Sequence, residues 1–90
     1  MATDGQNPEQ RTRGLREDFL ERADVMDGGV RALLSRLDLT RTDEDHERML
    51  DAMMGVSRAA DALRALARGD METAQEATRS MAYYAKRAQA

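Results

Sequence analysis

Residues 42–69, which read TDEDHERMLDAMMGVSRAADALRALARG, have the clearest helical pattern in the chain. Thr42 is a typical N-cap, and the three acids after it favour the positive end of a helix dipole. Gly69 is typical of the residue just past a helix C-terminus. Between them, one seam recurs at spacings of three and four: His46, Met49, Met53, Val56, Ala60, Leu63 and Ala67. The pattern predicts a helix over residues 43–68.

A second helix is predicted before this stretch and a third after it. Asn7 can cap a helix that starts at Pro8, and an apolar stripe then continues to about residue 38. That stripe contains Leu15, Phe19, Ala23, Met26, Val30, Leu33 and Leu37. After Gly69, Asp70 caps a helix expected over about residues 71–88. Residues 1–6 are expected to be a flexible polar tail, and residues 7–90 a single helical domain.

Two adjacent glycines, Gly28 and Gly29, interrupt the first predicted helix. Each glycine costs roughly 1 kcal/mol relative to alanine in a helix. The apolar stripe keeps its phase across the pair, because Met26 and Val30 are four residues apart. We therefore expect a weakened or kinked helix here, which is either a tolerated kink or a hinge.

The connections between the predicted helices are short, which makes neighbouring helices antiparallel. The predicted fold is therefore all-α, a three-helix antiparallel bundle. At 1.5 Å per residue the helices measure about 46, 39 and 27 Å, so the third is too short to cover the other two. We expect it to reach back only to about residue 50 of the second helix.

This mismatch predicts an uncovered apolar strip where the first helix ends and the second begins. The strip would consist of Leu34, Leu37, Met49, Leu50 and Met53. An uncovered strip of this kind is a recognition surface. The simplest way to cover it is a two-fold dimer, so we expect the chain to self-associate into a larger bundle, with a further protein partner as the alternative.

Composition narrows the function classes. The 90 residues contain 17 acids, 14 Lys and Arg, and no cysteine. Disulfides, thiolate metal sites and cysteine nucleophiles are thereby excluded. The net charge of −3 has the wrong sign for a typical nucleic-acid-binding protein. With neither a long apolar run nor a secretory signal pattern, we expect a cytoplasmic protein without membrane contact.

Arg41 and His46 are the strongest catalytic candidates. Their spacing, at the start of a predicted helix, resembles the R-x4-6-H motif of HEPN ribonucleases, although the match covers only residues 41–46. The resemblance implies a metal-independent ribonuclease. In it, His46 would act as a base toward a ribose 2′-OH, and Arg41 would hold the phosphate.

His46 also invites a metal hypothesis, because acids surround it in the sequence. A bundle metal site needs carboxylates from a facing helix. In a hairpin that turns near residues 40–41, His46 would face Ser35 rather than an acid. We therefore predict neither a metal nor a cofactor.

The end of the third helix is basic and aromatic. Its candidate residues are Arg79, Tyr83, Lys86 and Arg87. Aromatic rings interleaved with bases can stack on single-stranded nucleic acid, although bases at a helix C-terminus also complement its dipole. We expect a non-enzymatic protein-interaction, assembly or regulatory subunit. The alternatives are the HEPN-like ribonuclease and a small nucleic-acid-binding regulator.

Overall fold

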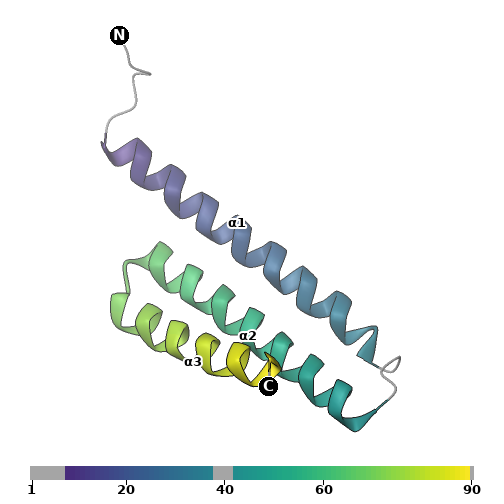
Figure 1. The fold of residues 1–90 in the computed structure, drawn as a ribbon. Helices are drawn as coiled ribbons and strands as arrows, with labels where there is room; N and C mark the ends of the chain where they lie inside the picture. The colour runs from purple at the N-terminus through teal and green to yellow at the C-terminus, as the bar shows by residue number, and fades with distance from the viewer. Residues whose placement is uncertain (1–7, 38–41, 90) are drawn as a thin grey trace.

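The computed structural model describes residues 8–37 and 42–89. They form three helices: α1 (Pro8–Leu34), α2 (Asp43–Arg68) and α3 (Met71–Gln89) (Figure 1). No strand occurs in these two ranges, so the predicted all-α, three-helix fold is confirmed. The predicted tail at residues 1–6 lies outside the described residues.

The predicted ends of α2 and the predicted start of α3 are confirmed, and α3 ends one residue later than predicted. The Thr42 side chain accepts a hydrogen bond from the backbone N–H of Asp45 at 3.0 Å. At the other end Gly69 is left-handed, with φ of 75°, a conformation that glycine adopts without the steric cost of a Cβ. Asp70 then caps α3 by accepting from the backbone N–H of Thr73 at 3.1 Å. Local capping chemistry therefore fixes the α2–α3 turn.

α1 ends at Leu34, about four residues earlier than predicted. The Ser35 hydroxyl donates to the carbonyl of Ala32 at 2.7 Å, and the N–H of Arg36 donates to the carbonyl of Leu33 at 3.0 Å. Serine hydroxyls compete with the backbone for helical hydrogen bonds, and three-residue spacing tightens a final turn. In contrast, α1 continues through the Gly28–Gly29 pair without a break.

α2 lies between α1 and α3, and it packs extensively against both (Figure 1). A Cβ added at Gly55 would lie 3.7 Å from the Cβ of Tyr84, so this side of α2 faces α3. Arg64 bonds to Asp24, so its side faces α1. Gly55 and Arg64 are nine residues apart, which is about 180° around a helix at 3.6 residues per turn. The helices therefore lie in a row, and α2 keeps two open faces.

The core is thin because small side chains fill it. The buried apolar residues are Ala23, Met53, Ala60, Ala62, Ala65, Ala67, Ala74 and Ala77. None of the large side chains in the described part of the chain falls below 2% exposure. Alanines let helix axes approach closely, but each buries little apolar area. Larger apolar side chains therefore remain partly or largely in solvent.

Candidate interaction surface

The two open faces of α2 differ in character. On one face, charged and hydroxyl side chains line a surface pocket between α2 and α3, among them Arg58, Asp61, Thr73 and Ser80. Arg58 bonds to Asp61 of its own helix at 3.0 Å. This polar face gives the row of helices one hydrated side.

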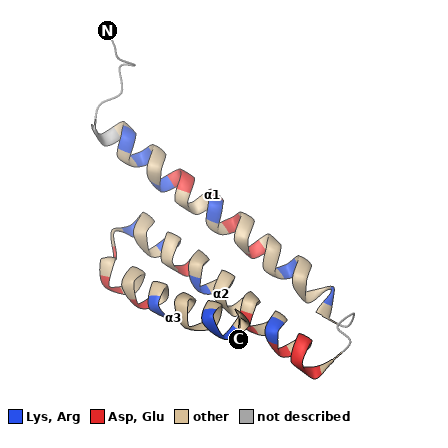
Figure 2. Ribbon diagram, viewed as in Figure 1, with Lys and Arg blue, Asp and Glu red and all other residues tan. Residues whose placement is uncertain are grey.

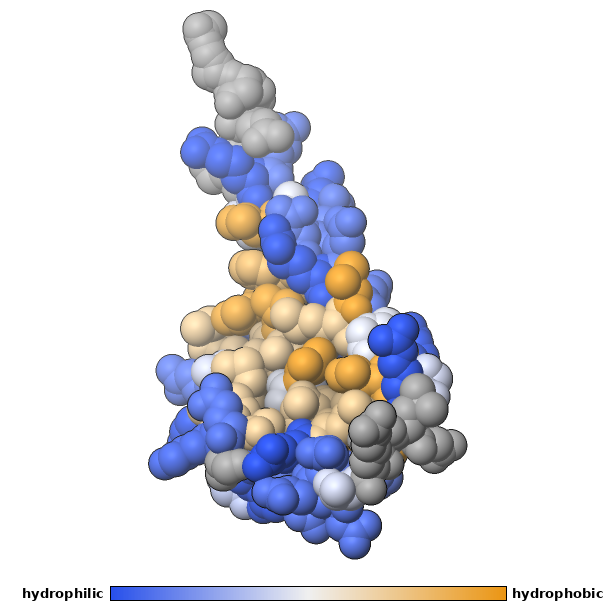
Figure 3. Space-filling model, turned by 45° about the vertical axis from the view of Figure 1, so that its right-hand side comes forward, coloured by the Kyte–Doolittle hydropathy of each residue, from blue (hydrophilic) through white to orange (hydrophobic). Residues whose placement is uncertain are grey.

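The opposite face is apolar. Leu66 of α2 and Met71 of α3 line a pocket there together. Leu63, Ala59 and Val56 precede Leu66 at spacings of three or four residues, so they share its side of α2. All three are only half-buried. Figure 3 shows a broad apolar surface with hydrophilic side chains at its rim. We call Val56, Ala59, Leu63, Leu66 and Met71 the apolar face.

α1 adds a further exposed segment. Residues 10–22 are all exposed except for the half-buried Phe19, and Ala23 is the first buried residue of the helix. The N-terminal end of α1 stands away from the α2–α3 hairpin (Figures 1 and 3). Leu15 is 56% exposed and Leu20 is 44% exposed. We call residues 10–22 the exposed half of α1.

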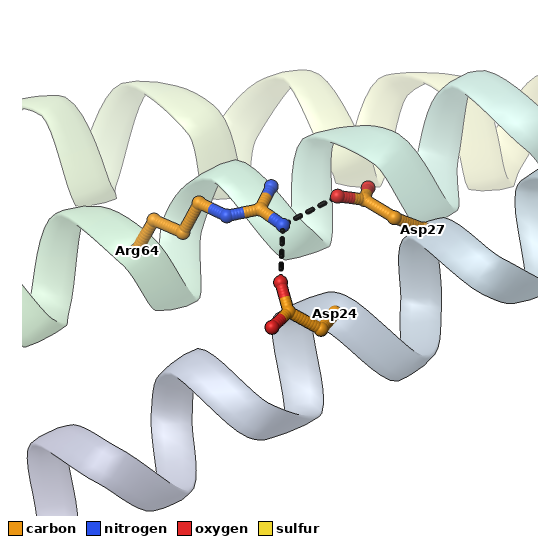
Figure 4. Close-up of polar contacts among 3 residues, drawn as sticks. All are labelled: Asp24, Asp27 and Arg64. Atoms are coloured by element: carbon orange, nitrogen blue, oxygen red, sulfur yellow. Dashed lines mark hydrogen bonds and ion pairs between the residues drawn. The ribbon is translucent and has the colours of Figure 1, made fainter.

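The contact between α1 and α2 is closed by an ion-pair cluster. Arg64 bonds to Asp24 at 3.2 Å and also to Asp27 (Figure 4). These hydrogen bonds, first with Asp27 and then with Asp24, raise the pKa of Arg64 above its ordinary value. Arg64 of α2 therefore links two turns of α1. Glu17 and Glu21 make no ion pair with any residue that the structure describes.

The strip predicted from helix lengths is only partly exposed. Leu34 is 51% exposed and Leu50 is 38% exposed, while Leu37 and Met49 are half-buried. Met53 is 6% exposed, so it belongs to the core and not to an exposed strip. Met53 lies seven residues, or about two turns, before the buried Ala60, so it shares the buried side of α2.

α3 ends where its predicted length places it. Arg87 bonds to Asp51 at 3.4 Å, which sets the end of α3 near residue 50 of α2. The guanidinium of Arg87 also lies 5.5 Å from the ring centroid of Tyr83 and donates to its hydroxyl at 2.9 Å. One side of the Tyr83 ring is therefore taken by Arg87, whereas Arg79 and Lys86 are exposed. The four candidates lie along the second half of α3, from Arg79 near its middle to Arg87 in its last turn.

The structure describes only one of the two catalytic candidates. Arg41 lies outside the described residues. His46 is half-buried in the first turn of α2, and its N–H donates to the carbonyl of Thr42 at 3.0 Å. Within residues 8–37 and 42–89, no group of three or more His, Cys, Asp or Glu side chains is placed to hold a metal ion.

No protein family, curated protein or solved structure matches this chain. Among the described helices, none is long and apolar enough to cross a membrane.

Proposed function

We propose that this chain is a non-enzymatic, cytoplasmic protein-interaction subunit that acts in assembly or regulation as a homo-oligomer, most simply a dimer. One observation carries the proposal. The chain buries mainly alanines in its core, while Val56, Leu63 and Leu66 on one side of the helix row are only half-buried and Met71 beside them is 56% exposed. Apolar side chains gathered on one surface, with a polar rim, are typical of protein-binding sites.

The asymmetry of the two faces supports a binding role over simple loose packing. The polar face has paired charges, such as Arg58 with Asp61, beside the exposed Leu50 and Met54. On the other face, Val56, Ala59, Leu63 and Leu66 form a continuous apolar run along α2. A protein partner would remove the apolar face from water and contribute to stability at about 25 cal/mol per Å² of apolar area.

Two methionines of similar exposure allow a matched test. Met71 lies on the apolar face and is 56% exposed, whereas Met54 of α2 lies outside that face and is 37% exposed. We expect Met71→Lys to weaken self-association, measured by sedimentation equilibrium, at least about tenfold, because a buried unpaired charge costs several kcal/mol. We expect Met54→Lys to leave association unchanged. Equal effects of the two substitutions would contradict the role of the apolar face.

A further inference from the structure

The exposed half of α1 is little covered by the rest of the described chain. Within residues 10–22 Phe19 is half-buried, while Leu15 is 56% exposed and Leu20 is 44% exposed. Most helix stability in proteins comes from packing an apolar face. A partner that covered Leu15 and Leu20 would therefore stabilise this part of α1.

The charges of this segment are ordered along the helix. Residues 10–16 have three bases and no acid, residues 17–21 have three acids and no base, and Arg22 follows them (Figure 2). The bases are Arg11, Arg13 and Arg16, and the acids are Glu17, Asp18 and Glu21. None of the six makes an ion pair with any other described residue. We call the three arginines the basic segment and the three acids the acidic segment.

The basic segment has no opposite charge close to it in the described chain. Arg11, Arg13 and Arg16 make no ion pair with any other described residue. An external acidic partner would bring opposite charges close to these arginines.

We propose that the exposed halves of α1 from two copies of this chain pack antiparallel, with the basic segment of each copy alongside the acidic segment of the other. This inference rests on the proposed interaction function and names the surface and its occupant. A two-fold axis near residues 16 and 17 places the basic segment of each copy alongside the acidic segment of the other. The same axis brings Leu15 and Phe19 of the two copies together.

A second copy fits this pattern better than a nucleic acid does. Phosphates would be attracted to Arg11, Arg13 and Arg16 but repelled by the acidic segment that begins at the next residue. A partner with acids opposite the bases and bases opposite the acids satisfies both segments. Another copy in antiparallel orientation has that arrangement by symmetry.

Two charge-reversed variants of the full chain test the pairing. The first combines Arg11→Glu, Arg13→Glu and Arg16→Glu, and the second combines Glu17→Arg, Asp18→Arg and Glu21→Arg. Each variant alone places like charges opposite each other, so we expect its dimer dissociation constant to rise at least about tenfold. An equimolar mixture should regain association as a mixed dimer, because the reversed segments complement each other.

Sedimentation equilibrium reports the masses, and circular dichroism checks that every variant stays helical. Lys86→Glu on α3, an exposed charge reversal away from α1, is the control and should leave association unchanged. Raising the salt from 0.1 M to 1 M should weaken the unmodified dimer, since the screening length falls from about 10 Å to 3 Å.

Three results would overturn the inference: an unmodified chain that stays monomeric, reversed variants that associate like the unmodified chain, or a mixture no tighter than either variant alone. If the charge-reversed variants associate like the unmodified chain and Met71→Lys does not associate, the α1 pairing is contradicted while the proposed function stands. If both charge-reversed variants lose self-association and Met71→Lys keeps it, the α1 pairing is supported and the role of the apolar face is contradicted.

Discussion

Arg64 of α2 bonds to Asp24 of α1 at 3.2 Å, and the same guanidinium nitrogen also bonds to Asp27. One cation thereby joins two turns of the neighbouring helix. The cluster lies close to Ala23, where the burial of α1 begins. It therefore stabilises the part of α1 that packs on α2 and leaves the exposed half of α1 available.

Arg64→Met tests this cluster. The substitution removes two ion pairs and leaves Asp24 and Asp27 close to each other, so we expect a loss of about 1 kcal/mol in the free energy of unfolding. Arg48→Met is the control, because the ion-pair partner of Arg48 among the described residues is Glu44 of its own helix, and the loss should stay below about 0.5 kcal/mol. Urea unfolding measures both, and equal losses would contradict the role assigned to Arg64.

The Asp70 cap predicts a pH dependence. Hydrogen bonds from the Thr73 side chain and backbone, with the charge of Arg68 nearby, hold the pKa of Asp70 below its ordinary value of 3.8. A carboxyl whose folded pKa is lowered stabilises the fold above its unfolded pKa, and this contribution is lost as pH falls through the folded pKa. Asp70→Ala should therefore lower Tm at pH 7. The difference from the unmodified chain should shrink below pH 3.8, and a difference that grows there would contradict the assignment.

The two adjacent glycines of α1 offer a stabilising change. A Cβ added at Gly28 or Gly29 would have no neighbouring atom within 4 Å, and neither residue has a positive φ. Replacing either with alanine should raise the free energy of unfolding by about 1 kcal/mol, because alanine loses less backbone entropy in a helix. Thermal unfolding measures the gain. Greater stability with loss of self-association would identify the pair as a hinge, whereas unchanged association would identify a tolerated feature.

His46 separates the non-enzymatic account from the ribonuclease alternative. We expect His46→Ala to retain its helical circular dichroism and its self-association, and the unmodified chain to purify without stoichiometric metal by elemental analysis. A nuclease of the HEPN type needs its histidine as a base. RNA cleavage by the unmodified chain that disappears in His46→Ala would overturn the non-enzymatic proposal.

Helix ends could be predicted wherever a local signal fixes them. Thr42, Gly69 and Asp70 act within one turn of their own positions, so the bounds of α2 and the start of α3 follow from sequence. The end of α1 could not be predicted in this way. Leu37 continues the apolar period, but the Ser35 hydroxyl bonds to a backbone carbonyl and the helix ends at Leu34.

The interaction surface was harder to predict because it depends on where the third helix sits. Val56 and Leu63 belong to the seam predicted to bury its side chains, yet both are only half-buried. Helical spacing places them on the same side of α2, but it does not tell whether a third helix covers that side. Gly55 was the available signal, since a glycine between larger residues marks the side on which α3 approaches closely.

The mass of the unmodified full chain in solution tests the central claim most directly. We predict that sedimentation equilibrium in 0.1 M salt gives a mass rising with concentration across the micromolar range toward about twice 10.1 kDa. A single species of 10.1 kDa at every concentration would contradict self-association through the exposed half of α1 and the apolar face.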